Sequence, residues 1–179
     1  MNLANSLTML RILLVPVFIT FVFMDKPYGS LIAAAVFLCA AATDSLDGYV
    51  ARKRQEITNM GKLLDPLADK LLVTAALVCL VQIGLIPAWI AVVIIGREFL
   101  VTGLRGIAAA EGLVIAATNL AKWKTVIQIA ALSALLLNEY FLLYLGFSPG
   151  QWLLYIAMAV TVYSGLDYLV QTFSQIKMT

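Results

Sequence analysis

Six long apolar stretches, separated by short polar or turn-forming segments, make up most of this 179-residue chain. They cover residues 6–24, 30–52, 61–84, 87–110, 122–145 and 151–173. Each is close to the roughly 20 residues that an α-helix needs to cross the hydrocarbon core of a bilayer. The pattern therefore predicts an all-α integral membrane protein, in which a bundle of six transmembrane helices forms a single domain over residues 1–179.

Composition supports this fold class and narrows the possible chemistry. The chain is 63% hydrophobic and 12% charged, whereas soluble domains are roughly 45–50% apolar and 25% charged. A net charge of +2 is too small to indicate nucleic-acid binding. The chain has no histidine, which excludes a zinc site built on imidazole, and its two cysteines lie in apolar runs, where they indicate packing rather than a disulfide framework.

The positions of lysine and arginine predict the orientation of the helices in the membrane. Basic residues gather in the second and fourth connections and in the tail: Arg52, Lys53, Arg54, Lys122, Lys124 and Lys177. The connections on the opposite side contain Lys26. We therefore expect a multi-pass protein of the cell membrane with both termini in the cytoplasm.

Four aspartates interrupt the apolar sequence around the connection between the second and third predicted helices: Asp44, Asp47, Asp65 and Asp69. Spacings of three and four residues place each pair on one helix face. The two helices are antiparallel, and a rise of 1.5 Å per residue brings Asp44 level with Asp69 and Asp47 level with Asp65. We expect the four carboxylates to meet about two turns below the cytoplasmic surface, in a site that opens to the cytoplasm.

The negative charge of such a cluster must be neutralised, because inserting one charged side chain at the centre of a spanning helix costs about 3 kcal/mol. Carboxylate oxygens suit hard divalent cations such as Mg²⁺ or Mn²⁺, and two such cations can clamp a diphosphate. Gly48 and Gly61 allow the backbone to approach a ligand closely. The planar guanidinium of Arg52 can donate two hydrogen bonds to one phosphate. The alternative is an inert polar core in which the aspartates pair with Arg11, Arg97 or Lys70.

The motif Asp44-x2-Asp47-Gly48-x2-Ala51-Arg52-x8-Gly61-x3-Asp65-x3-Asp69 resembles, position for position, the signature of the CDP-alcohol phosphatidyltransferase family. The resemblance covers the whole chain and implies a homodimer with CDP-diacylglycerol as donor and an alcohol as acceptor. It implies that the four aspartates hold two divalent cations and that Asp69 also deprotonates the acceptor hydroxyl. The residues that it assigns to CDP-diacylglycerol are Thr8, Asp47, Gly48, Ala51, Arg52 and Gly61.

Three further segments, at residues 5–11, 96–105 and 121–125, resemble family members whose acceptor is glycerol-3-phosphate, although Ala4 and Ala121 stand where proline and glycine are usual. The acceptor phosphate then needs cationic partners. The candidates are Arg97, Arg105, Lys122 and Lys124. Pairing with a buried carboxylate is the alternative for Arg97, and positive-inside topology is the alternative for the two lysines. Glu98 adjoins Arg97, and we expect the two not to face each other on a helix.

Other acceptors, a cation transporter and a prenyltransferase are the alternatives to this function. Within the family, the acceptor could instead be inositol phosphate, serine or phosphatidylglycerol. A divalent-cation transporter would also contain intramembrane carboxylates, but it predicts polar residues through the full depth of the bundle, and here they crowd the cytoplasmic half. A membrane prenyltransferase uses aspartates and magnesium on diphosphates, but it lacks the Gly48-x2-Ala51-Arg52 element.

Overall fold

The computed structural model describes residues 3–24, 28–54, 59–110 and 119–176. Within these ranges, the side chains at 3–5, 7, 44–54, 59–66, 69, 109–110, 119–122 and 173–176 lie outside the description. The described residues form α-helices joined by turns and contain no β-strand. The prediction of an all-α protein is therefore confirmed.

The described part of the chain contains seven helices. They are α1 (Leu3–Val22), α2 (Gly29–Arg54), α3 (Asn59–Gln82), α4 (Ala88–Ala110), α5 (Asn119–Leu136), α6 (Asn138–Leu145) and α7 (Pro149–Ile176).

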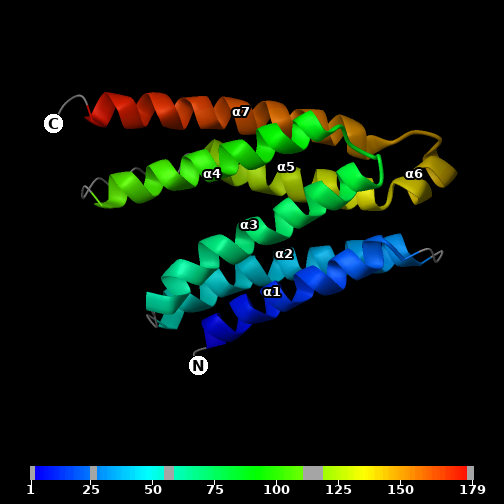
Figure 1. Cartoon of the computed structure of the whole chain (residues 1–179), viewed down its shortest axis with the longest axis horizontal. Coiled ribbons are helices and arrows are strands. Elements are labelled where there is room, and N and C mark those ends of the chain that lie inside the picture. The colour runs from blue at the N-terminus through cyan, green and yellow to red at the C-terminus, as the bar shows by residue number, and fades with distance from the viewer. Residues whose placement is uncertain (1–2, 25–27, 55–58, 111–118, 177–179) are drawn as a thin grey trace.

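The long helices run alternately up and down a single elongated bundle (Figure 1). α1 packs on α2 and α3, and α7 packs on α4 and α5. Contacts of α2 with α5 and of α3 with α4 join these two groups. Both chain termini, the carboxyl end of α2 and the amino end of α3 lie at the left end of the bundle in Figure 1, which we call the termini end.

The fifth apolar stretch differs from the prediction of one straight helix over residues 122–145. The chain bends by 73° between Trp123–Leu136 and Asn138–Leu145, which gives α5 and α6. Leu137 leaves the helical conformation at φ −94° and ψ 15°, and the buried amide of Asn138 accepts a hydrogen bond from Ser148 Oγ. A buried amide needs such a partner, and the partner lies in the following turn, so the bend brings the two together.

Close packing of small residues and large apolar side chains holds the bundle together. Phe18 and Phe37 pack on each other, with ring centroids 5.8 Å apart, and both are fully buried. α7 approaches α5 closely at Gly150, because a Cβ atom at this position would lie 2.8 Å from Leu135 N. Any larger residue at 150 would push the two helices apart.

Many large apolar side chains on the outside of the bundle are exposed, as expected for a protein that faces lipid. Among the described residues, one helix segment, Pro149–Thr172, is long and apolar enough by itself to cross a membrane. The bent α5–α6 pair is also long and apolar enough if its two helices are counted as one span. Within the described residues, shorter apolar segments lie in α1 (Thr8–Val22), α2 (Gly29–Thr43) and α3 (Lys70–Gln82). The number of spans therefore stays a prediction.

Candidate active site

The two halves of the aspartate motif lie on adjoining antiparallel helices. α2 contains Asp44, Asp47, Gly48, Ala51 and Arg52, and α3 contains Gly61, Asp65 and Asp69. The two helices contact each other, and the part of each that carries the motif lies toward the termini end (Figure 1). The backbone thus has the antiparallel arrangement from which the sequence predicts a carboxylate cluster.

The convergence of the four carboxylates themselves stays a prediction, because the side chains of these residues lie outside the part of the protein that the structure describes. The same holds for the side chain of Lys122. Among the side chains that the structure does describe, no group of three or more His, Cys, Asp or Glu could hold a metal ion. The described residues therefore leave the predicted metal site on α2 and α3 untested.

A second group of charged residues lies between α4 and α5. Lys124 Nζ donates a hydrogen bond to Glu98 Oε1, and Arg97 Nη1 lies 3.1 Å from the same oxygen. The expectation that Arg97 and Glu98 do not face each other was wrong, because both side chains are long enough to bend toward each other from neighbouring positions. One carboxylate thus neutralises two of the four cations that the sequence assigns to the acceptor phosphate.

Arg97 also connects α4 to α7. Its Nε donates to Thr161 O at 3.1 Å, and its Nη2 donates to Ser164 Oγ at 2.8 Å. Gly165 makes room for this contact, since a Cβ there would lie 2.9 Å from Arg97 Cγ. The small residues of α7 are a sequence signal for a bulky neighbour, and they place Arg97 in a helix interface rather than at a free surface.

The other described candidates lie in different surroundings. Arg105 is exposed, and its guanidinium carbon is 5.7 Å from the centroid of the Tyr168 ring, within the range of a cation–π interaction. Thr8, on α1, is 1% exposed. Arg105 is therefore accessible to a soluble anion, whereas Thr8 is buried.

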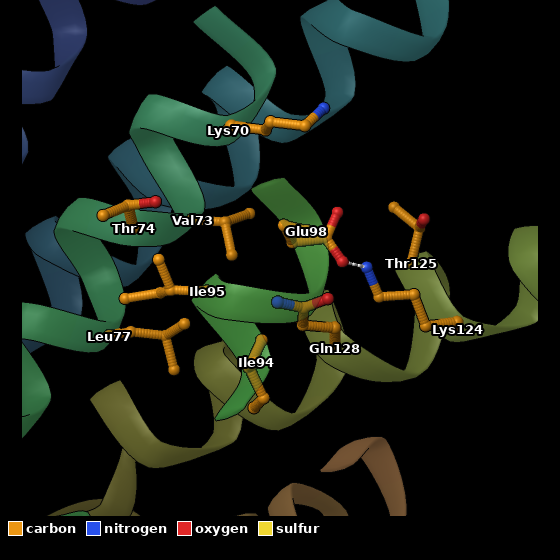
Figure 2. A pocket seen from close by; sticks show the side chains of 10 residues that line it. All are labelled: Lys70, Val73, Thr74, Leu77, Ile94, Ile95, Glu98, Lys124, Thr125 and Gln128. Atoms are coloured by element: carbon orange, nitrogen blue, oxygen red, sulfur yellow. Dashed lines mark hydrogen bonds and ion pairs between the residues drawn. The ribbon is translucent and has the colours of Figure 1, made fainter. Parts of the chain in front are cut away.

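A small cavity of about 30 Å³ lies between α3, α4 and α5. Its polar lining consists of Lys70, Thr74, Glu98, Lys124, Thr125 and Gln128, and apolar residues such as Leu77 and Ile94 complete it (Figure 2). The sequence reasoning missed Gln128, although its spacing of four residues from Lys124 places both on one helix face. It considered Lys70 only as a counter-ion, although Lys70 directly follows Asp69.

An apolar groove of about 430 Å³ runs along the outside of α3 and α4 beside this cavity. Lys70 and Thr74 line both, so the groove and the cavity adjoin. The rest of the groove is formed by Leu67, Leu71, Phe99, Thr102 and Gly103. Its size lies within the range of small-molecule sites in proteins.

Comparison with known proteins identifies the family. The family model described as CDP-alcohol phosphatidyltransferase matches residues 1–163. A CDP-diacylglycerol–glycerol-3-phosphate 3-phosphatidyltransferase of Bacillus subtilis is 44% identical, over 98% of this chain and 97% of that protein. A protein of the same name from Pseudomonas fluorescens is 40% identical, over 99% and 93%.

A cardiolipin synthase (CMP-forming) of Oryza sativa is also 40% identical, over 78% of this chain but only 46% of the rice protein. This chain belongs to the CDP-alcohol phosphatidyltransferase family, and the resemblance that its motif indicated is confirmed. It is thus an all-α protein of a membrane-embedded transferase family.

Proposed function

We propose that this protein transfers the phosphatidyl group of CDP-diacylglycerol to sn-glycerol-3-phosphate, which gives phosphatidylglycerophosphate and CMP. The observation that carries the proposal is the 44% identity, over nearly the full length of both chains, to a relative named for this reaction. The segments at 5–11, 96–105 and 121–125, which resemble members that use glycerol-3-phosphate, support the same acceptor.

In this proposal Asp44, Asp47, Asp65 and Asp69 hold two divalent cations, Mg²⁺ or Mn²⁺. Four carboxylates on two adjoining helices make an all-oxygen donor set, which fits these hard cations. When bound, the cations neutralise the charge of the donor diphosphate and of the departing CMP.

Asp69 acts as the general base and takes the proton of the primary hydroxyl of the acceptor. The freed oxygen forms a bond to the phosphorus that carries diacylglycerol, and the bond between that phosphorus and the bridging oxygen breaks. CMP leaves with the electron pair of the broken bond. Thr8, Asp47, Gly48, Ala51, Arg52 and Gly61 bind and orient the CDP moiety during this step.

The acceptor phosphate is bound by cations of α4 and α5. Arg105 is exposed, and Lys122 belongs to the segment at 121–125 that resembles members using glycerol-3-phosphate, so we assign them the first contacts with the phosphate. Arg97 and Lys124 are already paired with Glu98. They therefore contribute positive potential and hold the helices in place, and they contact the phosphate directly only if the Glu98 pairs open.

The donor also needs a place for its hydrocarbon, and the groove between α3 and α4 fits one acyl chain. Leu67, Leu71 and Phe99 provide apolar contacts. Lys70, which lines both the groove and the polar cavity, carries a charge complementary to the lipid phosphate. A chain in this groove would join a headgroup site to the surrounding bilayer without crossing the bundle.

The proposal includes the remaining membrane arrangement. The chain forms one domain with six spans, lies in the cell membrane with both termini and the active site at the cytoplasmic face, and works as a homodimer. Supporting this arrangement, both termini and the motif-bearing parts of α2 and α3 lie at one end of the bundle (Figure 1). The basic residues of the second and fourth connections favour that end as the cytoplasmic one.

The experiment is CMP release by the purified protein with CDP-diacylglycerol and Mg²⁺ or Mn²⁺. Glycerol-3-phosphate, inositol phosphate, serine and phosphatidylglycerol are supplied separately, and EDTA serves as the metal-free control. We expect release with glycerol-3-phosphate and none after chelation. Release with a different acceptor alone would overturn the substrate assignment, and undiminished release in EDTA would overturn the metal assignment.

Phosphatidylglycerol is the second candidate acceptor, because the rice relative named cardiolipin synthase (CMP-forming) is 40% identical. That similarity covers less than half of the rice protein. The cationic residues around α4 and α5 also favour an acceptor with a free phosphate, since phosphatidylglycerol offers a diester with less charge.

A further inference from the structure

The side-chain nitrogen of Gln128, Nε2, has no hydrogen-bond acceptor among the described residues, although it is buried. Gln128 is 3% exposed, and its Nε2 donates no hydrogen bond to any group in the described part of the protein. A buried donor without an acceptor destabilises the fold. Leucine at this position of an apolar helix would avoid that loss, so the amide points to an acceptor that comes from a ligand.

The surroundings of Gln128 define what such a ligand can offer. Gln128 lines the cavity of about 30 Å³ together with Glu98 and Lys124, whose ion pair forms one wall (Figure 2). Leu77 and Ile94 line another part of it. A volume of this size has room for one hydroxyl group or one to two water molecules, but not for a phosphate group as well.

The lining of the cavity includes the chain neighbour of the proposed general base. Lys70, in the lining, directly follows Asp69 on α3, and successive helical residues rise by only 1.5 Å. An acceptor whose reacting hydroxyl reaches Asp69 therefore brings its next polar group close to this cavity. In glycerol-3-phosphate that group is the middle hydroxyl, which does not react.

We propose that Gln128 is a specificity-determining residue that donates a hydrogen bond from Nε2 to the non-reacting hydroxyl beside the reacting one. The ligand class is a phosphorylated polyol with two neighbouring hydroxyls. The phosphate lies outside the cavity, toward Arg105 and Lys122. This inference rests on the proposed function and adds to it the residue that recognises the polyol.

The test compares glycerol-3-phosphate with 3-hydroxypropyl phosphate, which lacks only the middle hydroxyl, in CMP release by the wild type and by Gln128→Leu. For the wild type, we expect kcat/KM to be about tenfold higher with glycerol-3-phosphate, which corresponds to one hydrogen bond. In Gln128→Leu this preference disappears, because kcat/KM falls for glycerol-3-phosphate and stays unchanged for the analogue.

Ser133→Ala is the matched control. Ser133 is buried on the same helix, its hydroxyl donates to Ile129 O at 2.8 Å, and it does not line the cavity. We expect this variant to keep the wild-type preference. Gln128→Leu should unfold in detergent at the same temperature as the wild type or higher, since it removes an unpaired donor.

Three outcomes would overturn the inference. An equal fall with both substrates would make Gln128 a structural residue, and an unchanged preference would mean that the cavity holds only water. If Gln128→Leu keeps its preference while wild-type release is robust, the proposed function stands and only the role of Gln128 fails. A wild type that releases no CMP with glycerol-3-phosphate would overturn the proposed function and this inference with it.

Discussion

At the scale of single residues, Glu98 changes how the cationic side chains of this protein are understood. Lys124 and Arg97 are largely buried, with side chains 5% and 13% exposed, and both bind the same carboxylate. Removing one partner from a buried ion pair typically costs about 3–5 kcal/mol. Glu98 is therefore needed to keep these two cations inside an apolar bundle, whatever their contact with substrate.

Asp69→Asn tests the general base at the same scale. Asparagine keeps the shape of the side chain but cannot accept the proton, so we expect kcat to fall by at least about a hundredfold. Binding of CDP-diacylglycerol should be largely retained. Single-turnover CMP release and a separate donor-binding measurement distinguish these effects.

Asp167→Asn is the matched control for that variant, because it makes the same chemical change on α7. Asp167 Oδ2 accepts a hydrogen bond from Gln171 Nε2 at 3.0 Å, four residues along the same helix. We expect near-wild-type release from this variant. Turnover in Asp69→Asn equal to that of Asp167→Asn would remove Asp69 as the base.

At the scale of helices, α3 and α4 carry a polar surface and an apolar surface that adjoin each other. α3 and α4 together form both the polar cavity, with α5, and the apolar groove on the outside. Lys70 and Thr74 take part in both. Two helices thus offer a charged cavity on one side and an apolar groove on the other, an arrangement that suits the lipid donor we propose.

Gly103→Leu tests whether this groove holds an acyl chain. A Cβ at Gly103 meets nothing within 4 Å, so leucine fills the groove without disturbing the packing of the bundle. We expect KM for long-chain CDP-diacylglycerol to rise about tenfold, as when roughly two methylene groups lose their apolar contacts. KM for glycerol-3-phosphate and for a short-chain donor should not change.

Gly106→Leu is the control for the groove variant. Gly106 lies on the same helix, is equally open at Cβ and does not line the groove. We expect it to keep wild-type kinetics. If Gly103→Leu leaves the KM for long-chain CDP-diacylglycerol unchanged, the groove is occupied by bulk lipid and not by the donor. If Gly103→Leu instead changes the oligomeric state in detergent, the groove is a contact with a second copy of the chain.

At the scale of the whole molecule, the alternating helices bring both termini to the end where the motif-bearing parts of α2 and α3 lie (Figure 1). α6 and the turn that follows it lie at the opposite end. The exposed Trp152, near the start of α7, is at this second end, as expected for an aromatic side chain at a membrane interface.

Reporter fusions test the orientation that we propose. A fluorescent protein fused to the carboxyl terminus should fluoresce, because the proposed orientation places that terminus in the cytoplasm. Alkaline phosphatase inserted in the turn at residues 146–148 should be active, because its disulfides form only outside the cytoplasm. The same reporters exchanged between the two positions provide the control, and the reversed pattern would contradict the proposed orientation.

The sequence alone was sufficient for the fold class and the family. Apolar runs long enough to span a bilayer predict helices through their length and hydropathy, which are local properties. The aspartate motif has fixed spacings within two adjoining helices, so its positions at one end of the bundle follow from the chain order and helix geometry. Both were confirmed where the described residues and the comparisons test them.

The tertiary structure decided the features that depend on contacts between distant segments. The bend at Leu137 accompanies a hydrogen bond between Asn138 and Ser148, a contact that cannot be read from the hydropathy of the run. The pairing of Lys124 with Glu98 joins side chains 26 residues apart. The lack of an acceptor for Gln128 Nε2 among the described residues becomes evident only when α3 and α4 pack around it, because burial is a property of the packed bundle and not of the residue.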